Sequence, residues 1–429
     1  MRPIAVAGAS AASPRFGGIS SSRPEESTLR DTWRWFALSR LLIWFVGCTA
    51  VAALGTAALN LHQYDPAGIS TSFGLVGNVL GAPAVRWDAI WYLQIAEHGY
   101  RTSQDAGFLP LYPLLIRVGS IFTGSPAIAG VLISLAALFV GLEIIRRLTA
   151  LELGPRVAGT TVKLIAFGPL AVFMSAVYTE SLFVMLSAGT FYAARRGRWW
   201  LAGVLGGLAA LSRIGGSLLL VPMVMLFFYG PRADLEPQLT GAWFKPRYRF
   251  SPEVLWAALI PAASALFSGY LALRGLGADA TLHAQQTYWA HRIGLPVTAV
   301  WQGAEAAWRE LGQEVTGVSV PFSQSDSILQ FSALLLAVVV LIGVFRRLPI
   351  AYGTYVALGL LQALAAPTIG DPLRGLDRYS SMRFPLFMCA AAWAVERGAE
   401  RKLLVISVLL LAFFTIQFAT WQWVGSAVL

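Results

Sequence analysis

The stretch SPAIAGVLISLAALFVGLEII, residues 125–145, decides the fold of this chain. An α-helix needs roughly 20 apolar residues to cross the hydrocarbon of a bilayer, and this stretch holds one charged residue, Glu143. Comparable apolar stretches lie near residues 37–59, 157–177, 179–195, 199–214, 215–230, 253–273, 327–345, 350–367, 383–396 and 403–423. The sequence therefore predicts about ten or eleven transmembrane helices.

The composition of the whole chain indicates the same class. Of its 429 residues, 56% are hydrophobic and 13% are charged, with a mean hydropathy of +0.63. So few charged side chains could not coat the surfaces of two or three soluble domains, which excludes a soluble multidomain protein of this length. We expect an all-α polytopic membrane protein.

The formal net charge of +10 comes from arginines that stand in short clusters between the apolar stretches. This distribution favours membrane topology over nucleic-acid binding, because basic residues collect in cytoplasmic loops. The predicted cytoplasmic clusters are the N-terminal tail, Arg146-Arg147, residues 195–198, residues 245–249, Arg346-Arg347 and residues 397–402. The predicted outer segments are 60–124, 178–180, 212–213, 275–326 and 368–383.

The same features predict the domain organisation. Residues 1–33, rich in Ser, Arg, Ala and Pro, are expected to be a disordered cytoplasmic tail. Residues 34–429 are expected to form the integral-membrane domain, in which 60–124 is a large extracytoplasmic loop with interfacial helices. Residues 108–117 could instead begin a short crossing. The interfacial interpretation is favoured because it keeps all arginine clusters on one side.

Residues 86–100, RWDAIWYLQIAEHGY, place an acid among aromatic side chains beside the first apolar stretch. Read as one helix, the segment puts Asp88 and Tyr92 on one stripe and Arg86 and Glu97 on the opposite one. A carboxylate at that position is a candidate for chemistry at a bilayer surface. An aromatic-belt helix with solvated charges is an equally good interpretation of the residues alone.

Ordered motifs extend this pattern along the chain. They are RWD at 86–88 with Tyr92, FLPLYP at 108–113, YTESLF at 178–183, AR at 194–195 with SR at 212–213, and RY at 378–379 with FPLF at 384–387. In this order they resemble the PIG-V family of mannosyltransferases, including its bacterial members. The resemblance covers about residues 35–400.

The resemblance implies a GT-C-type bundle and a glycosyltransferase whose active site is extracytoplasmic. It implies a polyprenyl-phosphate-linked mannose donor, a hydroxyl acceptor on a glycolipid, glycan or glycoprotein, and inversion at the anomeric carbon. By the family's pattern Asp88 is the general base. The expected location is the plasma membrane, with the N-terminus cytoplasmic and no cofactor, and the acceptor stays open.

The departing polyprenyl phosphate gains negative charge and needs cations. Arg378, Arg374 or Arg383 in the last outer loop and Arg213 at the end of a span are candidate clamps, because guanidinium binds phosphate bidentately. Arg378 is the first choice, since Tyr379 follows it as in the family. The full set of expected substrate-binding residues is Arg86, Trp87, Tyr92, Glu97, Tyr178, Glu180, Arg213, Gln286, Arg378 and Tyr379.

Each of these positions has a plainer interpretation. Glu180 could cap the following helix or pair with Arg213, and Arg213 could extend its charge from a span end to the headgroups. Gln286 lies in a polar and aromatic segment of the kind that binds sugars, which is also a normal interfacial loop.

Metal and nucleotide sites find no support in the sequence. His283 and His291 are eight residues apart without a nearby acid at metal spacing, and Cys48 and Cys389 both fall inside predicted spans. The glycine-rich residues 203–216 follow no strand and lack a GK[ST] ending, so they are expected to let helices pack closely.

Two other function classes stay open at this stage. A secondary transporter or lipid flippase would also have many spans and arginines, although the ionisable residues gather near the membrane faces and no long internal repeat is visible. A non-catalytic subunit of a glycosyltransferase complex would show the same motifs.

Overall fold

The structure is a computed structural model, and it describes residues 23–237, 245–315 and 327–421. The α-helices are α1 (Arg23–Leu54), α2 (Ala58–Tyr64), α3 (Gly74–Gly81), α4 (Ala89–His98), α5 (Leu111–Thr123), α6 (Pro126–Leu153), α7 (Pro155–Ala166), α8 (Glu180–Arg195), α9 (Trp199–Ser212), α10 (Leu220–Tyr229), α11 (Leu259–Leu273), α12 (Ala280–Thr287), α13 (Pro296–Val315), α14 (Ser327–Arg347), α15 (Ile350–Ala365), α16 (Leu376–Ser381), α17 (Phe384–Arg397) and α18 (Glu400–Ala419). Short 3-10 helices are η1 (Ile69–Thr71), η2 (Asp105–Gly107), η3 (Ile214–Leu219) and η4 (Pro252–Ala258).

The all-α prediction is confirmed. Within the described ranges, β pairing is limited to isolated bridges that join His291 to Thr368 and Thr368 to Asp371. Five helical stretches of the described chain are long and apolar enough to cross a membrane: Thr28–Leu54, Pro126–Leu153, Pro252–Leu273, Ser327–Arg347 and Glu400–Ala419. Shorter apolar helices are Leu111–Thr123, Trp199–Ser212, Ile214–Tyr229 and Ile350–Ala365. The chain is a multi-pass membrane protein.

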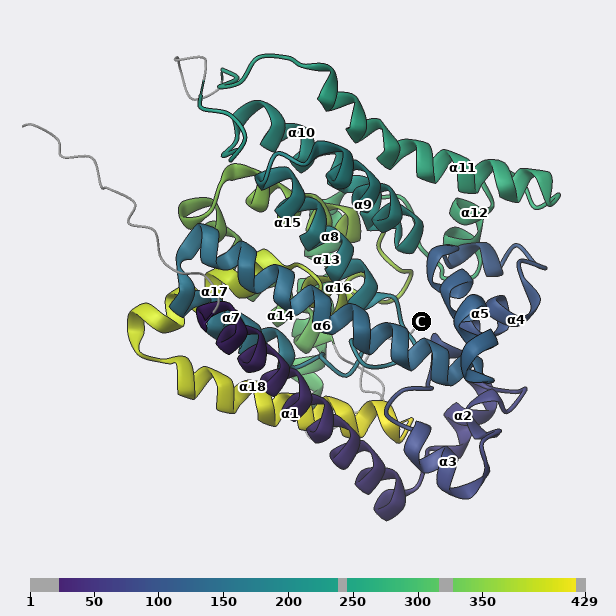
Figure 1. The fold of residues 1–429 in the computed structure, drawn as a ribbon. Coiled ribbons are helices and arrows are strands. Elements are labelled where there is room, and N and C mark those ends of the chain that lie inside the picture. The colour runs from purple at the N-terminus through teal and green to yellow at the C-terminus, as the bar shows by residue number, and fades with distance from the viewer. Residues whose placement is uncertain (1–22, 238–244, 316–326, 422–429) are drawn as a thin grey trace, which may run out of the picture.

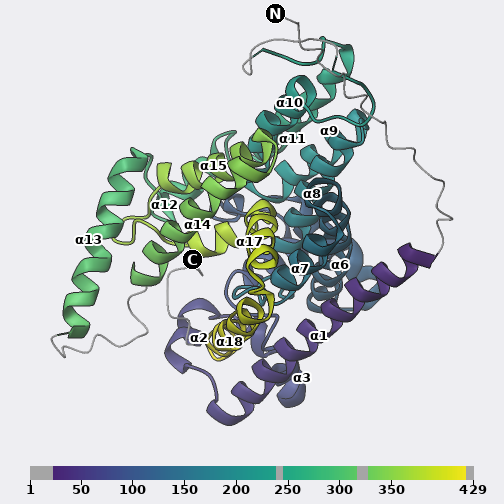
Figure 2. The same cartoon turned by 90° about the vertical axis from the view of Figure 1, so that its left-hand side faces the viewer.

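The long helices form one bundle, and α6 runs across the middle of the view in Figure 1. Helix α6 packs against α5, α7 and α8, α8 packs against α9, and α9 packs against α11. Helix α18 lies beside α1, although the two helices are at opposite ends of the chain. Helix α13 stands out from the side of the bundle, where it packs against α14 and α15 (Figure 2).

Close helix contact along α9 depends on glycine, as the sequence predicts. A Cβ atom at Gly203 would lie 2.3 Å from the carbonyl oxygen of Trp256, and one at Gly207 would lie 3.0 Å from that of Leu259. Both of these neighbours are backbone atoms, which a side-chain rotation cannot move. Only a residue without a Cβ allows α9 to approach η4 and α11 this closely.

The predicted span at 157–177 is wrong as a continuous helix. Helix α7 ends at Ala166, and residues 167–179 form buried turns. The local reason is Gly168-Pro169, because proline lacks an N–H and disfavours helical backbone in the residue before it. Arg40 of α1 satisfies the freed carbonyls, donating from Nη2 to Ala166 at 2.6 Å and from Nη1 to Ala171 at 3.0 Å.

The interpretation of residues 86–100 as one helix is also wrong. Helix α4 begins at Ala89, and Trp87 has φ of 54°, in the left-handed region, which breaks the helix before Asp88. At the other end of the chain, α1 begins at Arg23, inside the segment 1–33 expected to be a disordered tail, and residues 1–22 lie outside the described part.

Helix α5 occupies most of the segment whose crossing was left open. Its 13 residues extend about 20 Å, which is short of the roughly 30 Å of hydrocarbon in a bilayer. One side of α5 exposes Leu114, Val118, Ile121 and Phe122. Length and exposure both favour the interfacial interpretation.

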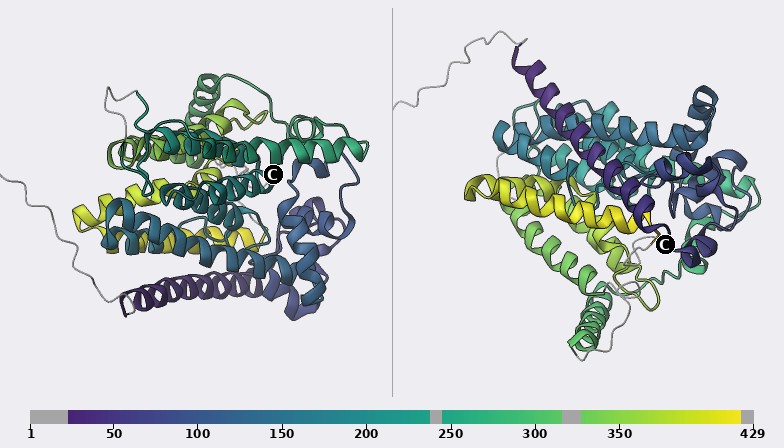
Figure 3. Two further views of the ribbon diagram at one scale, coloured as in Figure 1. Left: turned by 45° about the horizontal axis from the view of Figure 1, so that its top comes forward. Right: turned by 90° about the horizontal axis from the view of Figure 1, so that it is seen from below.

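The two ends of the bundle differ in chemistry. Short helices α2 to α5 and α12 gather at one end (Figures 1 and 3). Several arginines form ion pairs around the opposite end, where α17 turns into α18 and α6 into α7. These pairs are Arg146–Glu143, Arg195–Glu152, Arg156–Glu400 and Arg347–Glu396.

The end of α18 supports the loop before α4. Arg86 donates from Nε to the carbonyl of Ala419 at 3.1 Å, and the rings of Trp87 and Trp421 lie 4.6 Å apart. The loop thus rests on residues that are far from it in sequence.

Candidate active site

Four segments of the chain meet around one cavity of about 280 Å³. Its lining residues fall within 88–109, 212–215, 282–293 and 359–383, together with Phe183 of α8. Most of this lining lies in segments that the arginine distribution places on one side of the membrane. The polar residues expected outside therefore share one pocket.

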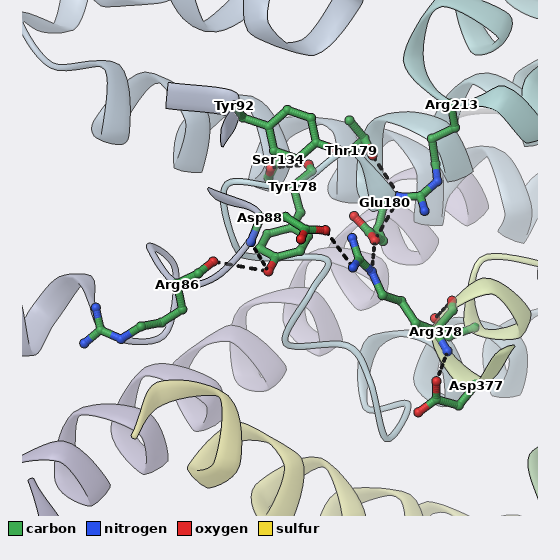
Figure 4. Close-up of polar contacts among 11 residues, drawn as sticks. Arg86, Asp88, Tyr92, Ser134, Tyr178, Thr179, Glu180, Arg213, Asp377 and Arg378 are labelled. Atoms are coloured by element: carbon green, nitrogen blue, oxygen red, sulfur yellow. Dashed lines mark hydrogen bonds and ion pairs between the residues drawn. The ribbon is translucent and has the colours of Figure 1, made fainter. Parts of the chain in front are cut away.

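Asp88 lies in the wall of this cavity, at the residue just before α4. Its side chain is largely buried, and Oδ2 accepts a hydrogen bond of 2.8 Å from Nη1 of Arg378 (Figure 4). Within the described residues, Oδ1 accepts no hydrogen bond. Burial raises the pKa of the Asp88 carboxyl, and the charge of Arg378 opposes this effect. One oxygen is held, and the other is open to a ligand.

Tyr178 fixes the loop that presents Asp88. Its hydroxyl accepts a hydrogen bond of 3.1 Å from the N–H of Asp88 and donates one of 3.2 Å to the carbonyl of Arg86. The buried turns of 167–179 deliver this tyrosine to the loop. Trp87, in left-handed backbone between the two bonded residues, turns the chain there.

A second carboxylate, Glu180, joins two arginines behind Asp88 (Figure 4). Its Oε1 accepts hydrogen bonds from Nε of Arg378 at 2.5 Å and from Nη1 of Arg213 at 3.0 Å. Arg213 also donates to Oγ1 of Thr179 at 2.9 Å. The pairing of Glu180 with Arg213, one of the alternatives from the sequence, is confirmed. Two acids and two arginines balance in charge.

Aromatic side chains form much of the remaining wall. Tyr92 lies one turn after Asp88 on α4, and its hydroxyl is 3.3 Å from Oγ1 of Thr179. Trp289 lines the cavity near Phe108, with the two ring centres 5.4 Å apart. Gln286 lines the same region. Flat rings beside amide groups are suited to binding sugars, whose faces are apolar and whose edges carry hydroxyls.

The structure brings most of the predicted site residues together. Those lining the cavity are Asp88, Tyr92, Arg213, Gln286, Arg378 and Tyr379. Those lying behind it, in contact with the lining residues or with the loop before α4, are Arg86, Trp87, Tyr178 and Glu180. Glu97 lies apart from the cavity: its half-exposed carboxylate is 3.9 Å from His98.

Sequence reasoning missed other residues of the site. Thr179 stands inside the YTESLF motif, so the motif itself could have pointed to it. Gln362 in α15 lines the cavity from a helix whose sequence gives no chemical signal. In the described parts of the chain, no group of three or more His, Cys, Asp or Glu side chains is placed to hold a metal ion.

Residues 32–228 match the protein family described as Mannosyltransferase (PIG-V). The rat protein named GPI alpha-1,6-mannosyltransferase 2 is 33% identical over 155 residues, which is 33% of this chain and 31% of the rat protein. The human protein of that name is 31% identical over 153 residues. GPI mannosyltransferase 2 of Yarrowia lipolytica is 28% identical over 184 residues, 43% of this chain and 50% of the yeast protein. The chain thus spans between about a third and a half of the length of these relatives.

Solved structures of the Archaeoglobus fulgidus oligosaccharyltransferase are more distant. One, in complex with Zn and sulfate, is 14% identical with a TM-score of 0.39, covering 90% of this chain and 53% of that chain. Another, in complex with an inhibitory peptide and a dolichol-phosphate, has a TM-score of 0.40 at 14% identity, covering 90% and 56%. Likeness at this level does not establish a shared fold.

The family match covers the segments that contribute Asp88, Tyr92, Tyr178, Glu180 and Arg213. These five residues belong to the RWD motif with Tyr92, the YTESLF motif and the SR motif. The structure brings all five to the cavity or directly behind it. Residues 32–228, just under half of this chain, thus match the PIG-V family of mannosyltransferases.

Proposed function

We propose that this protein transfers mannose from polyprenyl-phosphate-mannose to a hydroxyl group of an extracytoplasmic glycolipid, glycan or glycoprotein, with inversion at the anomeric carbon. The family match and the names of the relatives support the sugar and the reaction class. The observation that carries the proposal is Asp88, a buried carboxylate in the cavity wall with one oxygen held by Arg378 and the other open. That geometry is the one a general base needs.

The proposed reaction is a single displacement. The acceptor hydroxyl oxygen bonds to the anomeric carbon of mannose while its proton passes to Oδ1 of Asp88. The bond between that carbon and the phosphate oxygen breaks, and its electron pair stays on the phosphate. Attack from the side opposite the leaving group inverts the anomeric carbon. No metal or redox partner is needed to balance this step.

The surroundings of Asp88 favour this role. An unperturbed aspartate is a weak base for a hydroxyl proton, and burial strengthens it by raising the pKa of its conjugate acid. The hydrogen bond from Arg378 to Oδ2 keeps the carboxylate in one orientation. Glu180 neutralises one of the two positive charges of Arg213 and Arg378. The other positive charge remains to stabilise the ionised form of Asp88.

The proposed setting is the outer face of the plasma membrane, with the N-terminus in the cytoplasm. Positive-inside topology supports it, because the ion-paired arginines lie at one end of the bundle and α4 and α12, which line the cavity, lie at the other. The exposed apolar side of α5 lies beside the segment that supplies Phe108 and Leu109 to the cavity. A lipid-linked donor could reach the cavity from the bilayer along that side.

The test is transfer of labelled mannose from polyprenyl-phosphate-mannose by membranes that contain the protein. Asp88→Asn keeps the size of the side chain and removes the base, so we expect transfer to fall by about 10²-fold to 10⁴-fold. Equal amounts of each variant in the membrane are verified by immunoblotting.

The matched control is Asp279→Asn, which changes an exposed aspartate between α11 and α12 that lies outside the cavity lining. It should transfer mannose at the wild-type rate. Full activity of Asp88→Asn would remove the proposed base. Transport or lipid scrambling by purified protein in liposomes, without any sugar transfer, would replace the proposal with the transporter hypothesis.

A further inference from the structure

Arg383 is a buried arginine of the cavity that has no counter-charge among the residues the structure describes. It is the residue before α17, its side chain lines the cavity, and the residue is 4% exposed. Within the described residues, it forms no ion pair, and its Nη1 has no hydrogen-bond partner. Its guanidinium lies 4.8 Å from the ring of Tyr355 and 5.6 Å from that of Phe183. Aromatic faces attract a cation, but they do not replace the hydrogen bonds lost on burial.

Two glycines from different elements make room for this guanidinium. A Cβ atom at Gly359 of α15 would lie 2.4 Å from Cζ of Arg383. A Cβ atom at Gly215 of η3 would lie 3.2 Å from Nη2 of Arg383 and 3.0 Å from Oε1 of Gln362. The backbones of α15 and η3 therefore approach the guanidinium of Arg383 at a distance that only glycine allows. The position of Arg383 is built by the fold.

The other arginines of the cavity already face carboxylates. Arg378 bonds to Asp88 and Glu180, Arg213 bonds to Glu180, and Arg374 lies 3.6 Å from Asp371. These arginines and acids balance one another. The surplus positive charge of the described cavity wall is therefore located at Arg383.

We propose that Arg383 forms an anion subsite, together with Gln362 over Gly215 and Gly359, that binds the phosphate of the lipid-linked donor. This inference rests on the proposed function and names which arginine meets the leaving group. In the displacement, the electron pair of the broken bond stays on a phosphate oxygen, so the charge of the phosphate grows from one to two negative units. A planar guanidinium with free N–H groups binds that product by paired hydrogen bonds.

The test measures binding of farnesyl phosphate, a short polyprenyl phosphate, and of uncharged farnesol to the purified protein in detergent. Wild type should bind the phosphate more tightly than the alcohol. Arg383→Gln should weaken farnesyl phosphate binding by about 10-fold to 100-fold, the range for losing hydrogen bonds to a charged group, and leave farnesol binding unchanged. Arg383→Lys keeps the positive charge but loses the planar guanidinium. Its affinity for farnesyl phosphate should lie between those of wild type and Arg383→Gln.

Two further variants separate the subsite from the fold. Arg309→Gln removes an exposed arginine on α13 and should bind both ligands as wild type does. Unchanged farnesol binding by Arg383→Gln shows that its fold is intact. If that variant does not purify as a folded protein, Gly215→Val, which crowds Nη2 of Arg383, should weaken farnesyl phosphate binding selectively.

The outcomes distinguish this inference from the proposed function. Asp88→Asn should lose mannose transfer and still bind farnesyl phosphate in an Arg383-dependent way. If wild type transfers mannose and Arg383→Gln binds farnesyl phosphate with unchanged affinity, the subsite is wrong and the function stands. If binding depends on Arg383 but wild type transfers no mannose, the function is wrong and the subsite stands.

Discussion

Asp88 combines burial with a single arginine contact, and this combination predicts the pH dependence of transfer. Burial is the larger effect and raises the pKa of its carboxyl above the ordinary value, despite Arg378. A base with a raised pKa becomes protonated at a higher pH, so activity should be lost as the pH falls through that raised pKa. We expect the acid limb of kcat/KM to lie above pH of about 4, the ordinary range of an aspartate.

The pH profile of mannose transfer checks this prediction, provided that the protein keeps its fold across the range. Binding of farnesol at each pH serves as that control. An acid limb at or below the ordinary pKa of aspartate would contradict the effect of burial.

Tyr178 makes two hydrogen bonds to the loop before α4, and we expect it to position the proposed base. Tyr178→Phe keeps the ring but leaves the N–H of Asp88 without its partner, while the carbonyl of Arg86 keeps only the hydrogen bond from the N–H of Ala89. We expect a loss of stability of about 1–3 kcal/mol and a fall in kcat at nearly constant KM, since Asp88 shifts while the cavity stays intact.

Thermal unfolding in detergent and steady-state kinetics measure the two effects of this change. Tyr270→Phe is the matched control, because the hydroxyl of Tyr270 makes no hydrogen bond within the described residues. Equal kcat values for the two phenylalanine variants would show that Tyr178 does not position the base.

The sequence locates several single residues of the site but not their partners. Asp88, Tyr92, Arg213 and Arg378 stand in ordered motifs, and all four line the cavity. The contact between Asp88 and Arg378 joins positions 290 residues apart, which no local pattern encodes. The sequence also could not predict that Arg383 lacks an acidic partner among the described residues, because this depends on which acids the other arginines contact.

At the scale of elements, glycine spacing sets how closely α9 approaches its neighbours. Gly203→Ala would place a methyl group against the carbonyl oxygen of Trp256, where no side-chain rotation relieves the overlap. We expect a loss of about 1–3 kcal/mol of stability from the forced shift of η4 and α11.

Gly269→Ala on α11 provides a matched control, because a Cβ there meets nothing within 4 Å. It should be neutral or stabilising, by up to about 1 kcal/mol, since alanine is the better helix former. Thermal midpoints in one detergent compare the two variants. A midpoint for Gly203→Ala at or above that of wild type would contradict the close-packing account.

Hydropathy decides which helices could be predicted from the sequence. Long apolar stretches such as those of α6 and α14 can be recognised in the sequence, because a single helix that crosses the bilayer needs about 20 consecutive apolar residues. The buried turns of 167–179 have the same composition as a span, and only Gly168-Pro169 marks the break. The contacts of Arg40 with the carbonyls of Ala166 and Ala171 could not be foreseen, because both partners are backbone atoms.

At the scale of the whole molecule, the ion-paired arginines lie at the end of the bundle where α17 turns into α18, and α4 and α12, which line the cavity, lie at the other end. With Cys48 and Cys389 replaced by serine, single cysteines can report the side of each end. A membrane-impermeant maleimide should label Asp279→Cys in intact cells and Arg397→Cys only after permeabilisation, because both positions are exposed at their respective ends.

Reversed labelling would place the cavity in the cytoplasm and end the proposed reaction with an extracytoplasmic acceptor. The parent protein with both serines is the control for background labelling, and its mannose transfer shows that the fold is kept.

The support that α18 gives to the loop before α4 has a consequence for how the protein is made. A ribosome produces Arg86 and Trp87 long before their partners Ala419 and Trp421, because Ala419 follows Arg86 by 333 residues. The nascent protein therefore remains without a finished Asp88 loop until α18 has been inserted. Premature termination anywhere before α18 yields a chain that keeps most of its spans and lacks the support of the loop that carries the proposed base.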